Sequence, residues 1–143
     1  MNRKYRRKVQ YYETDQMGIV HHSNYIRWFE EARIDYLEKV DLSYERLESQ
    51  GVLSPVLSLT ADYLRMAHFG ETMIIDVSVE EYNGIKLTLA YEVANMRTDM
   101  VYCKGATKHC FINQEGRPLS LKQACPEIHE ILRKALEEDK KKK

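Results

Sequence analysis

The sequence is poor in cysteine and has no long apolar run, and each absence excludes a class of protein. Its 143 residues include three cysteines, which are too few and too irregularly spaced for a disulfide framework or a CxxC zinc site. No apolar stretch approaches the roughly 20 residues that a membrane-spanning helix requires. The first residues, MNRKYRRK, are not followed by the apolar segment of a signal peptide. We therefore expect a cytoplasmic protein.

The chain also has no net charge, but its charges are unevenly distributed. Lysine and arginine together number 22, as do aspartate and glutamate. Five basic residues fall in residues 1–8 and four in residues 140–143, so residues 9–139 carry 13 basic and 22 acidic side chains, a net charge of −9. An anionic body argues against a broad nucleic-acid-binding face. We interpret the basic ends as a solubility feature and expect contact with neither nucleic acid nor membrane.

Hydrophobic periodicity predicts one long helix among several strands. Apolar residues recur every three or four positions over residues 24–40, and mostly every second position after Pro55. Asn83-Gly84 lies between two alternating runs and predicts a hairpin with a type I′ turn, in which both central residues have positive φ. The last residues, 139–143, are expected to form a frayed basic tail. Strands are expected over residues 3–12, 57–63, 73–80, 87–93 and 100–112, and helices over residues 24–40, 44–50 and 126–138.

This order of elements predicts a single α+β domain over residues 1–143. Antiparallel strands joined by tight turns, with a helix segregated to one face, form that architecture. One helix cannot cover both faces of such a sheet, so a second copy is expected to hide the exposed face or edge. We therefore expect a homo-oligomer, either a dimer or a tetramer built as a dimer of dimers.

The residues that can carry chemistry are concentrated near the start of the long helix. Asp15 lies in the loop after the first strand, and His22 directly precedes the expected helix cap at Ser23 or Asn24. A helix start offers unpaired amides and about half a positive charge, which can hold a developing oxyanion. A carboxylate opposite that start can attack an acyl carbonyl directly or activate water as a general base. The spacing of Asp15 and His22 does not choose between these routes.

A dense motif of about 22 residues covers the same region. It reads Tyr12-x-Thr14-Asp15-x-x-Gly18-x-Val20-x-His22-x-Asn24-Tyr25, followed by Trp28-Phe29-Glu30-x-Ala32-Arg33. This motif resembles the signature of hot-dog-fold acyl-CoA thioesterases, the 4-hydroxybenzoyl-CoA thioesterase group and its Tol-Pal-associated relatives. The resemblance implies a hot-dog fold, in which an antiparallel sheet wraps around one long central helix. It also implies hydrolysis of an acyl-CoA substrate to the free acid and CoA, with no cofactor besides the CoA of the substrate.

The resemblance assigns roles to individual residues. The family's catalytic aspartate falls on Asp15, while its histidine and the helix-start amide that binds the thioester carbonyl both fall on His22. Its Asn-Tyr pair falls on Asn24 and Tyr25, and its helix glutamate falls on Glu30, which we interpret as an intersubunit partner. The residues expected to bind the substrate are Gly18, Val20, His21, Asn24, Tyr25, Arg65 and His68.

Coenzyme A carries several phosphate charges, whereas the body of the chain is anionic. The phosphates must therefore meet local cations. Arg65 and His68 are the first candidates, because they lie in the turn after the strand at residues 57–63, where the family often places a basic residue. Lys104 and Lys108, on one face of the last strand, are further candidates.

Two other kinds of site are less well supported by the spacing. His21, His22 and Asp15 contain metal-ligand side chains, but adjacent histidines on an extended segment point apart and no third histidine follows at helical spacing. His109 and Cys110 face opposite sides of a strand, which disfavours a nucleophile pair. We expect no metal site.

Three alternative functions remain beside acyl-CoA hydrolysis. The acyl donor can be an acidic acyl carrier protein, which the basic cluster at residues 3–8 could contact. A hot-dog module can also bind acyl-CoA without turnover, although the intact run from Asp15 to Tyr25 favours an enzyme. A hot-dog dehydratase has the least support, because its usual His-Asp helix arrangement is not evident.

Overall fold

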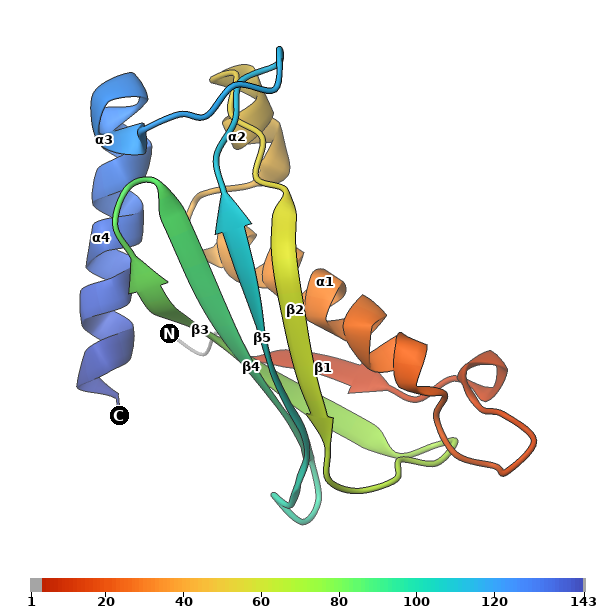
Figure 1. Cartoon of the computed structure of the whole chain (residues 1–143). Helices are drawn as coiled ribbons and strands as arrows, with labels where there is room; N and C mark the ends of the chain where they lie inside the picture. Colours follow the sequence, from red (N-terminus) through yellow and green to blue (C-terminus); the bar gives the residue numbers. More distant parts are fainter. Residues whose placement is uncertain (1–3, 143) are drawn as a thin grey trace. The chain divides into compact units, whose positions relative to one another are not determined.

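The computed structural model describes residues 4–142, and its elements follow the predicted order with shifted ends (Figure 1). The helices are α1 (His22–Lys39), α2 (Tyr44–Ser49), α3 (Leu121–Ala124) and α4 (Pro126–Lys141), with a 3₁₀ turn at η1 (Tyr11–Glu13). The strands are β1 (Tyr5–Lys8), β2 (Val56–Tyr63), β3 (Thr72–Tyr82), β4 (Lys86–Asn95) and β5 (Val101–Cys110). They form one antiparallel sheet in the order β1-β3-β4-β5-β2, which confirms the predicted α+β class. Within the described part of the chain, no helix has the length and apolarity needed to cross a membrane.

The chain divides into two compact groups of segments. The first group is made of Met1–Tyr36, Ala61–Val77 and Tyr91–Gly105. Its core contains the apolar face of α1, because Phe29 stacks on Tyr91 of β4 with ring centroids 4.5 Å apart, and Tyr25 contacts Tyr63 of β2 at 5.3 Å. The apolar face that the periodicity of residues 24–40 predicts is therefore buried.

The second group is made of Leu37–Thr60, Ser78–Ala90 and Ala106–Lys143. In this group α4 lies alongside the end of β3 (Figure 1). The Val79 N–H donates to Asp139 Oδ2 at 2.8 Å, and the Tyr82 hydroxyl lies 2.7 Å from His129 Nδ1. Among the described residues, β1 pairs with β3 from Thr72 to Ile75, and α4 supplies an acceptor to β3 beyond that pairing.

The first strand ends earlier than predicted. β1 stops at Lys8, and η1 follows where the strand was expected to continue to Tyr12. The turn forms because the Glu13 carboxylate accepts the Gln10 N–H at 2.8 Å, an arrangement that closes a capping box. Arg3, where the strand was predicted to begin, lies outside the described residues.

The long helix begins earlier than predicted. α1 starts at His22, so Ser23 and Asn24 lie in its first turn and neither is the cap. His21 takes the capping position instead, because its Nδ1 accepts the Ser23 N–H at 3.3 Å. The Asn24 side chain is buried and donates to the Glu13 carbonyl oxygen at 2.8 Å.

One further local prediction, the type I′ turn at Asn83-Gly84, is wrong. Gly84 has a φ of +91°, but Asp41 and Asp99 are the non-glycine residues with positive φ within residues 4–142, so Asn83 does not form a type I′ turn. Asn83 Oδ1 instead accepts two following N–H groups at 2.8 and 2.9 Å. α4 extends through Lys141, and Lys140 and Lys141 lie in its last turn, where cations interact favourably with the helix dipole. The fraying of residues 139–143 stays a prediction. Lys143 lies outside the described residues.

Candidate active site

Asp15 lies in a tight loop that folds back on itself just before α1. Thr14 and Val20 form an antiparallel bridge across the loop, and Gly18 turns the chain with a φ of +78°, which glycine adopts without a Cβ penalty. Asp15 Oδ1 accepts the Met17 N–H at 2.8 Å, so the carboxylate is held by the turn it belongs to. The Asp15 side chain is half-buried. The loop therefore fixes this carboxylate while leaving part of it accessible.

The loop is attached to the segment that follows β2. The Val20 N–H donates to the Ala67 carbonyl at 2.9 Å, and Ile19 and His68 form an antiparallel bridge. Val20 is consequently buried, which makes it part of the support of the loop. His68, predicted from the sequence as a substrate-binding cation, lies beside the loop that carries Asp15.

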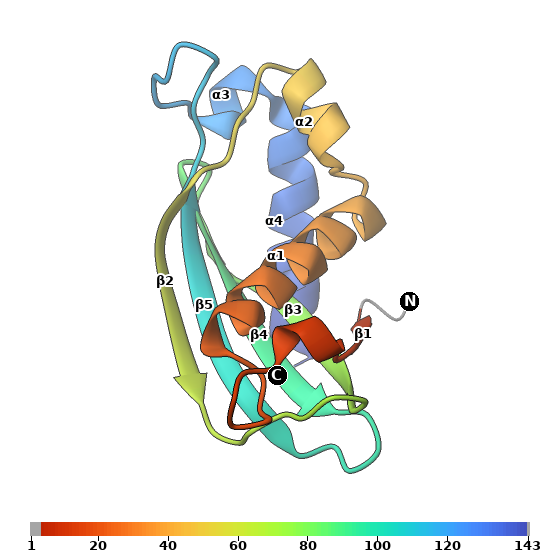
Figure 2. The same cartoon turned by 90° about the vertical axis from the view of Figure 1, so that its right-hand side faces the viewer.

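His22 opens α1 next to the same loop (Figure 2). No hydrogen bond between residues of the described range engages the His22 N–H, whereas the His22 carbonyl oxygen lies 3.4 Å from the donating Tyr63 hydroxyl. A free N–H at the start of an 18-residue helix is the kind of donor that stabilises an oxyanion.

The two adjacent histidines do not point apart as predicted. The ring centroids of His21 and His22 are 4.3 Å apart, because His22 is already helical and the segment is not extended. Over residues 4–142, no group of three or more His, Cys, Asp or Glu side chains is arranged to hold a metal ion.

Tyr25 forms the buried wall behind the helix start. Its ring lies between those of Trp28, at 4.9 Å, and Tyr63, at 5.3 Å, and the residue is 3% exposed. Burial raises the pKa of Tyr25 to about 12, although a hydrogen bond with the Ala67 backbone opposes the shift. The Tyr25 hydroxyl therefore stays neutral at physiological pH.

Arg65 and His68, the predicted phosphate-binding cations, are both exposed. Glu71 Oε1 accepts from the His68 N–H at 2.8 Å and lies 3.0 Å from His68 Nδ1. Burial alone would raise the pKa of Glu71, but hydrogen bonds from Tyr102, His68 and Asn95 lower it below its ordinary value. The anionic Glu71 carboxylate engages His68 Nδ1 and offsets positive charge on the ring. His68 is therefore a weaker partner for a CoA phosphate than an unpaired cation would be.

Arg33 and Glu30, further along α1, have different surroundings. Glu30 is exposed, so the prediction of an intersubunit contact stays a prediction. Arg33 is buried and donates from Nη1 to the Tyr91 hydroxyl at 3.1 Å.

Glu13, which was not predicted as a site residue, is the centre of a buried network. Its carboxylate is 2% exposed and accepts from Arg7, from the Gln10 N–H and from Trp28 Nε1. The motif places Glu13 in a polar run, where a loop carboxylate is normally solvated. Arg7 and Trp28 lie six and fifteen residues from Glu13 and belong to different elements, β1 and α1, so only the tertiary structure reveals the contacts.

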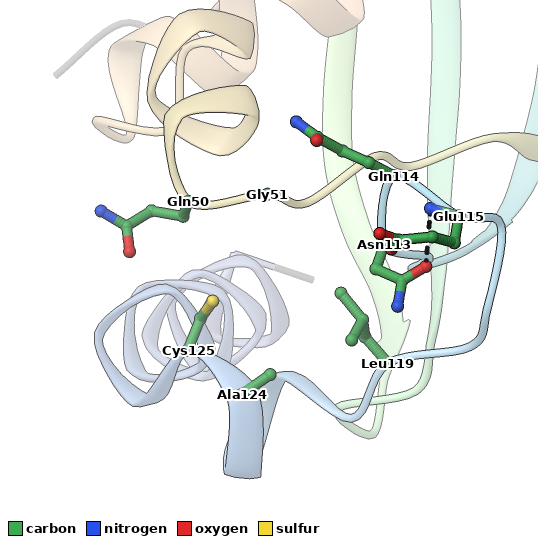
Figure 3. Close-up of a pocket in the computed structure, with 8 residues that line it drawn as sticks. All are labelled: Gln50, Gly51, Asn113, Gln114, Glu115, Leu119, Ala124 and Cys125. Carbon is green, nitrogen blue, oxygen red and sulfur yellow. Dashed lines mark hydrogen bonds between the residues drawn. The ribbon is translucent and has the colours of Figure 1, made fainter.

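One cavity among the described residues lies in the first group. That cavity has a volume of about 690 Å³ and is lined by Phe69, Gly70, Glu71, Thr72, Asn95, Met96, Arg97, Thr98 and Tyr102. In the second group, Lys108 and Lys86 line a cavity of about 420 Å³. A cavity of about 280 Å³, also in the second group, lies among the end of α2, the turn after β5 and the start of α4 (Figure 3). Asn113 Oδ1 accepts the Glu115 N–H at its rim, and none of the predicted site residues lines it.

Known thioesterases and a thioesterase-like family are similar to this chain over nearly its whole length. The sequence profile of the thioesterase-like superfamily matches residues 9–136. YneP of Bacillus subtilis (strain 168), whose name assigns it provisionally as an acyl-CoA thioesterase, is 35% identical over 129 residues, which cover 90% of this chain and 93% of YneP. The acyl-CoA thioesterase YbgC of Haemophilus influenzae is 30% identical over 71% of this chain and 74% of its own. The crystal structure of DHNA-CoA thioesterase from Staphylococcus aureus superposes with a TM-score of 0.89 at 31% identity, covering 98% of this chain and 94% of that one.

Proposed function

This chain belongs to the thioesterase-like superfamily, and from that membership we propose that it hydrolyses acyl-CoA thioesters to the free carboxylic acid and CoA. The predicted hot-dog fold is confirmed by the same comparisons. The observation that supports the reaction most directly is local: the free His22 N–H opens α1 beside the loop that carries Asp15. The 4-hydroxybenzoyl-CoA subgroup and the Tol-Pal association stay predictions.

In the proposed reaction, the His22 N–H donates to the thioester carbonyl oxygen. The helix start favours the negative charge that develops on this oxygen in the transition state. Asp15 accepts a proton from water while the water oxygen bonds to the carbonyl carbon. The tetrahedral intermediate then breaks its C–S bond, and the departing CoA sulfur takes up a proton. In the alternative route, Asp15 itself attacks the carbonyl carbon, and the C–S bond breaks to give a mixed anhydride and CoA thiolate, which takes up a proton. Water then hydrolyses the anhydride to the free acid and restores the Asp15 carboxyl group.

Both routes need the Asp15 carboxylate and neither needs a metal or a redox cofactor. We therefore propose that a chelator leaves the rate unchanged. A single turnover in ¹⁸O-labelled water separates the routes, because label in the Asp15 carboxyl group arises only from an anhydride.

The remaining predicted substrate residues differ in the part they can play. His21 and Tyr25 surround the helix start, and Gly18 shapes the Asp15 loop. Asn24 is buried and bonded to the Glu13 backbone, so we propose that it supports the site rather than touching the acyl group. Arg65 is proposed to meet a CoA phosphate, with a smaller part for His68 because of its Glu71 partner.

We propose that the active form is a homo-oligomer, a dimer or a dimer of dimers. β2 is the last strand in the sheet order, and Val56, Leu57 and Tyr63 on it are 45%, 53% and 45% exposed. An open apolar edge strand is a template for pairing with another chain. Light scattering during size exclusion tests this: a monomer with full activity contradicts it.

Acyl-CoA turnover by the purified protein tests the proposed function. Aliphatic and aromatic acyl-CoA thioesters are supplied, and free thiol is followed with a thiol reagent. Release of CoA is the expected result, and an acyl carrier protein substrate tested in parallel decides the donor. Arg7 of the basic cluster is bonded to Glu13 and Glu31, whereas Arg6 and Lys8 are exposed, so a carrier would be expected to contact those two residues. Tight acyl-CoA binding with no thiol release would support a binding module instead.

A further inference from the structure

Glu13 is buried, and each of its two carboxylate oxygens accepts two hydrogen bonds. Oε1 accepts from Arg7 Nη1 at 3.1 Å and from the Gln10 N–H at 2.8 Å. Oε2 accepts from Arg7 Nη2 at 2.9 Å and from Trp28 Nε1 at 2.8 Å. Trp28 belongs to α1, so the carboxylate is bonded to the helix about 1.7 turns after its start at His22.

The backbone carbonyl of the same residue is tied to the start of the helix. It accepts the His21 N–H at 2.9 Å and Asn24 Nδ2 at 2.8 Å. His21 directly precedes His22, whose N–H is the proposed oxyanion donor. Glu13 thus holds α1 at three points, one through its carboxylate and two through its carbonyl.

Glu13 also lies two residues before Asp15. Thr14, the residue between them, forms the bridge with Val20 that closes the Asp15 loop. The loop and the helix start therefore meet at a single residue. A displacement of Glu13 moves the Asp15 carboxylate relative to the His22 N–H.

We propose that Glu13 is a positioning residue that sets the geometry between the Asp15 carboxylate and the His22 N–H. This inference rests on the hydrolytic function proposed above. A buried ion pair is a poor device for stability alone, since well-packed apolar residues often do as well. Its hydrogen bonds are directional, however, and a misplacement of about 1 Å between reacting groups can lower a rate by about 100-fold.

The experiment compares two variants that each remove a polar group from a buried aromatic side chain in the first group. Trp28→Phe removes the Nε1 donor to Glu13 and keeps an aromatic ring against Tyr25. Tyr91→Phe, the matched control, removes the hydroxyl that accepts from Arg33 and keeps the stack on Phe29. Measured are kcat and KM for the best acyl-CoA substrate, together with amide hydrogen exchange over residues 20–25.

Trp28→Phe is expected to lower kcat about 10- to 100-fold with KM within about twofold of wild type, because the alignment matters in the transition state. Exchange at the helix start should become faster. Tyr91→Phe should keep kcat within about twofold. Glu13→Gln, which also disturbs the Arg7 contact, should lower kcat at least as far as Trp28→Phe.

The results that overturn the inference differ from those that overturn the proposed function. An active wild type in which Trp28→Phe loses no more kcat than Tyr91→Phe, or in which KM rises alone, overturns the positioning role. A wild type that hydrolyses no acyl-CoA overturns the proposed function, and the catalytic part of the inference with it.

Discussion

Arg7→Met removes the cation that compensates the buried Glu13 carboxylate. Glu13 is 2% exposed at its side chain and Arg7 is 14% exposed. Breaking a buried pair by removing one partner costs about 3–5 kcal/mol, because the remaining charge stays desolvated. Gln10 and Trp28 still donate to Glu13, so we expect a loss at the lower end, about 3 kcal/mol. Against a total of about 5–15 kcal/mol for a typical domain, the variant should fold with a clearly reduced free energy of unfolding.

Neutralising both partners should recover part of this loss. In Arg7→Met/Glu13→Gln, no buried charge remains and the amide oxygen still accepts one hydrogen bond, so the expected cost relative to wild type is about 1–2 kcal/mol. Urea denaturation at one fixed protein concentration measures all variants. Arg133→Met is the matched control, since Arg133 also bonds two carboxylates, Glu130 and Glu137, but on the exposed side of α4. Its urea midpoint should not change measurably. The reasoning from burial is refuted if the double variant has a lower free energy of unfolding than Arg7→Met. It is also refuted if Arg133→Met loses as much stability as Arg7→Met.

Three further outcomes follow from the local structure. Gly18→Ala should lower stability by about 1 kcal/mol and also reduce kcat, because alanine at a φ of +78° strains the Asp15 loop; unchanged unfolding and turnover would contradict this. Glu71 has a pKa below its ordinary 4.5, so its contribution to stability is present above pH 4.5 and is lost as the pH falls below that value. Glu71→Gln should therefore make the acid side of the stability curve shallower, as measured by urea titrations between pH 3 and pH 6. Asp139→Leu leaves the buried Val79 N–H without this acceptor and should cost about 1–3 kcal/mol in the same assay, whereas a neutral result would show that α4 does not secure β3.

Periodic features of the fold could be predicted from the sequence, because periodicity reports on a regular backbone. The apolar face of α1 and the strands from Val56 to Cys110 agree with the pattern to within a few residues. The α3 turn at Leu121–Ala124 has no periodic signal of its own and was not predicted. The ends of β1 and α1 could not be placed, because they depend on hydrogen bonds between side chains and a distant backbone.

The candidate site, too, could be predicted from the sequence only in part. The motif located Asp15 and His22, but it could not show that His21 caps the helix or that Asn24 is turned inward. The role of Glu13 depends on contacts with Arg7 and Trp28, which belong to different elements, β1 and α1. His68 was predicted as a free cation, and its pairing with Glu71 depends on the turn between β2 and β3.

The most direct test of the central claim is the rate of acyl-CoA hydrolysis by Asp15→Asn. Asparagine keeps a side-chain oxygen for the Met17 N–H, so the turn is preserved while the charge and the basicity are lost. Asp99→Asn is the control, because Asp99 is an exposed turn residue with a φ of +61° that asparagine tolerates. We expect Asp15→Asn to lower kcat at least about 100-fold at unchanged stability, and Asp99→Asn to match wild type. Turnover by Asp15→Asn as fast as wild type would contradict the assignment of Asp15 as base or nucleophile.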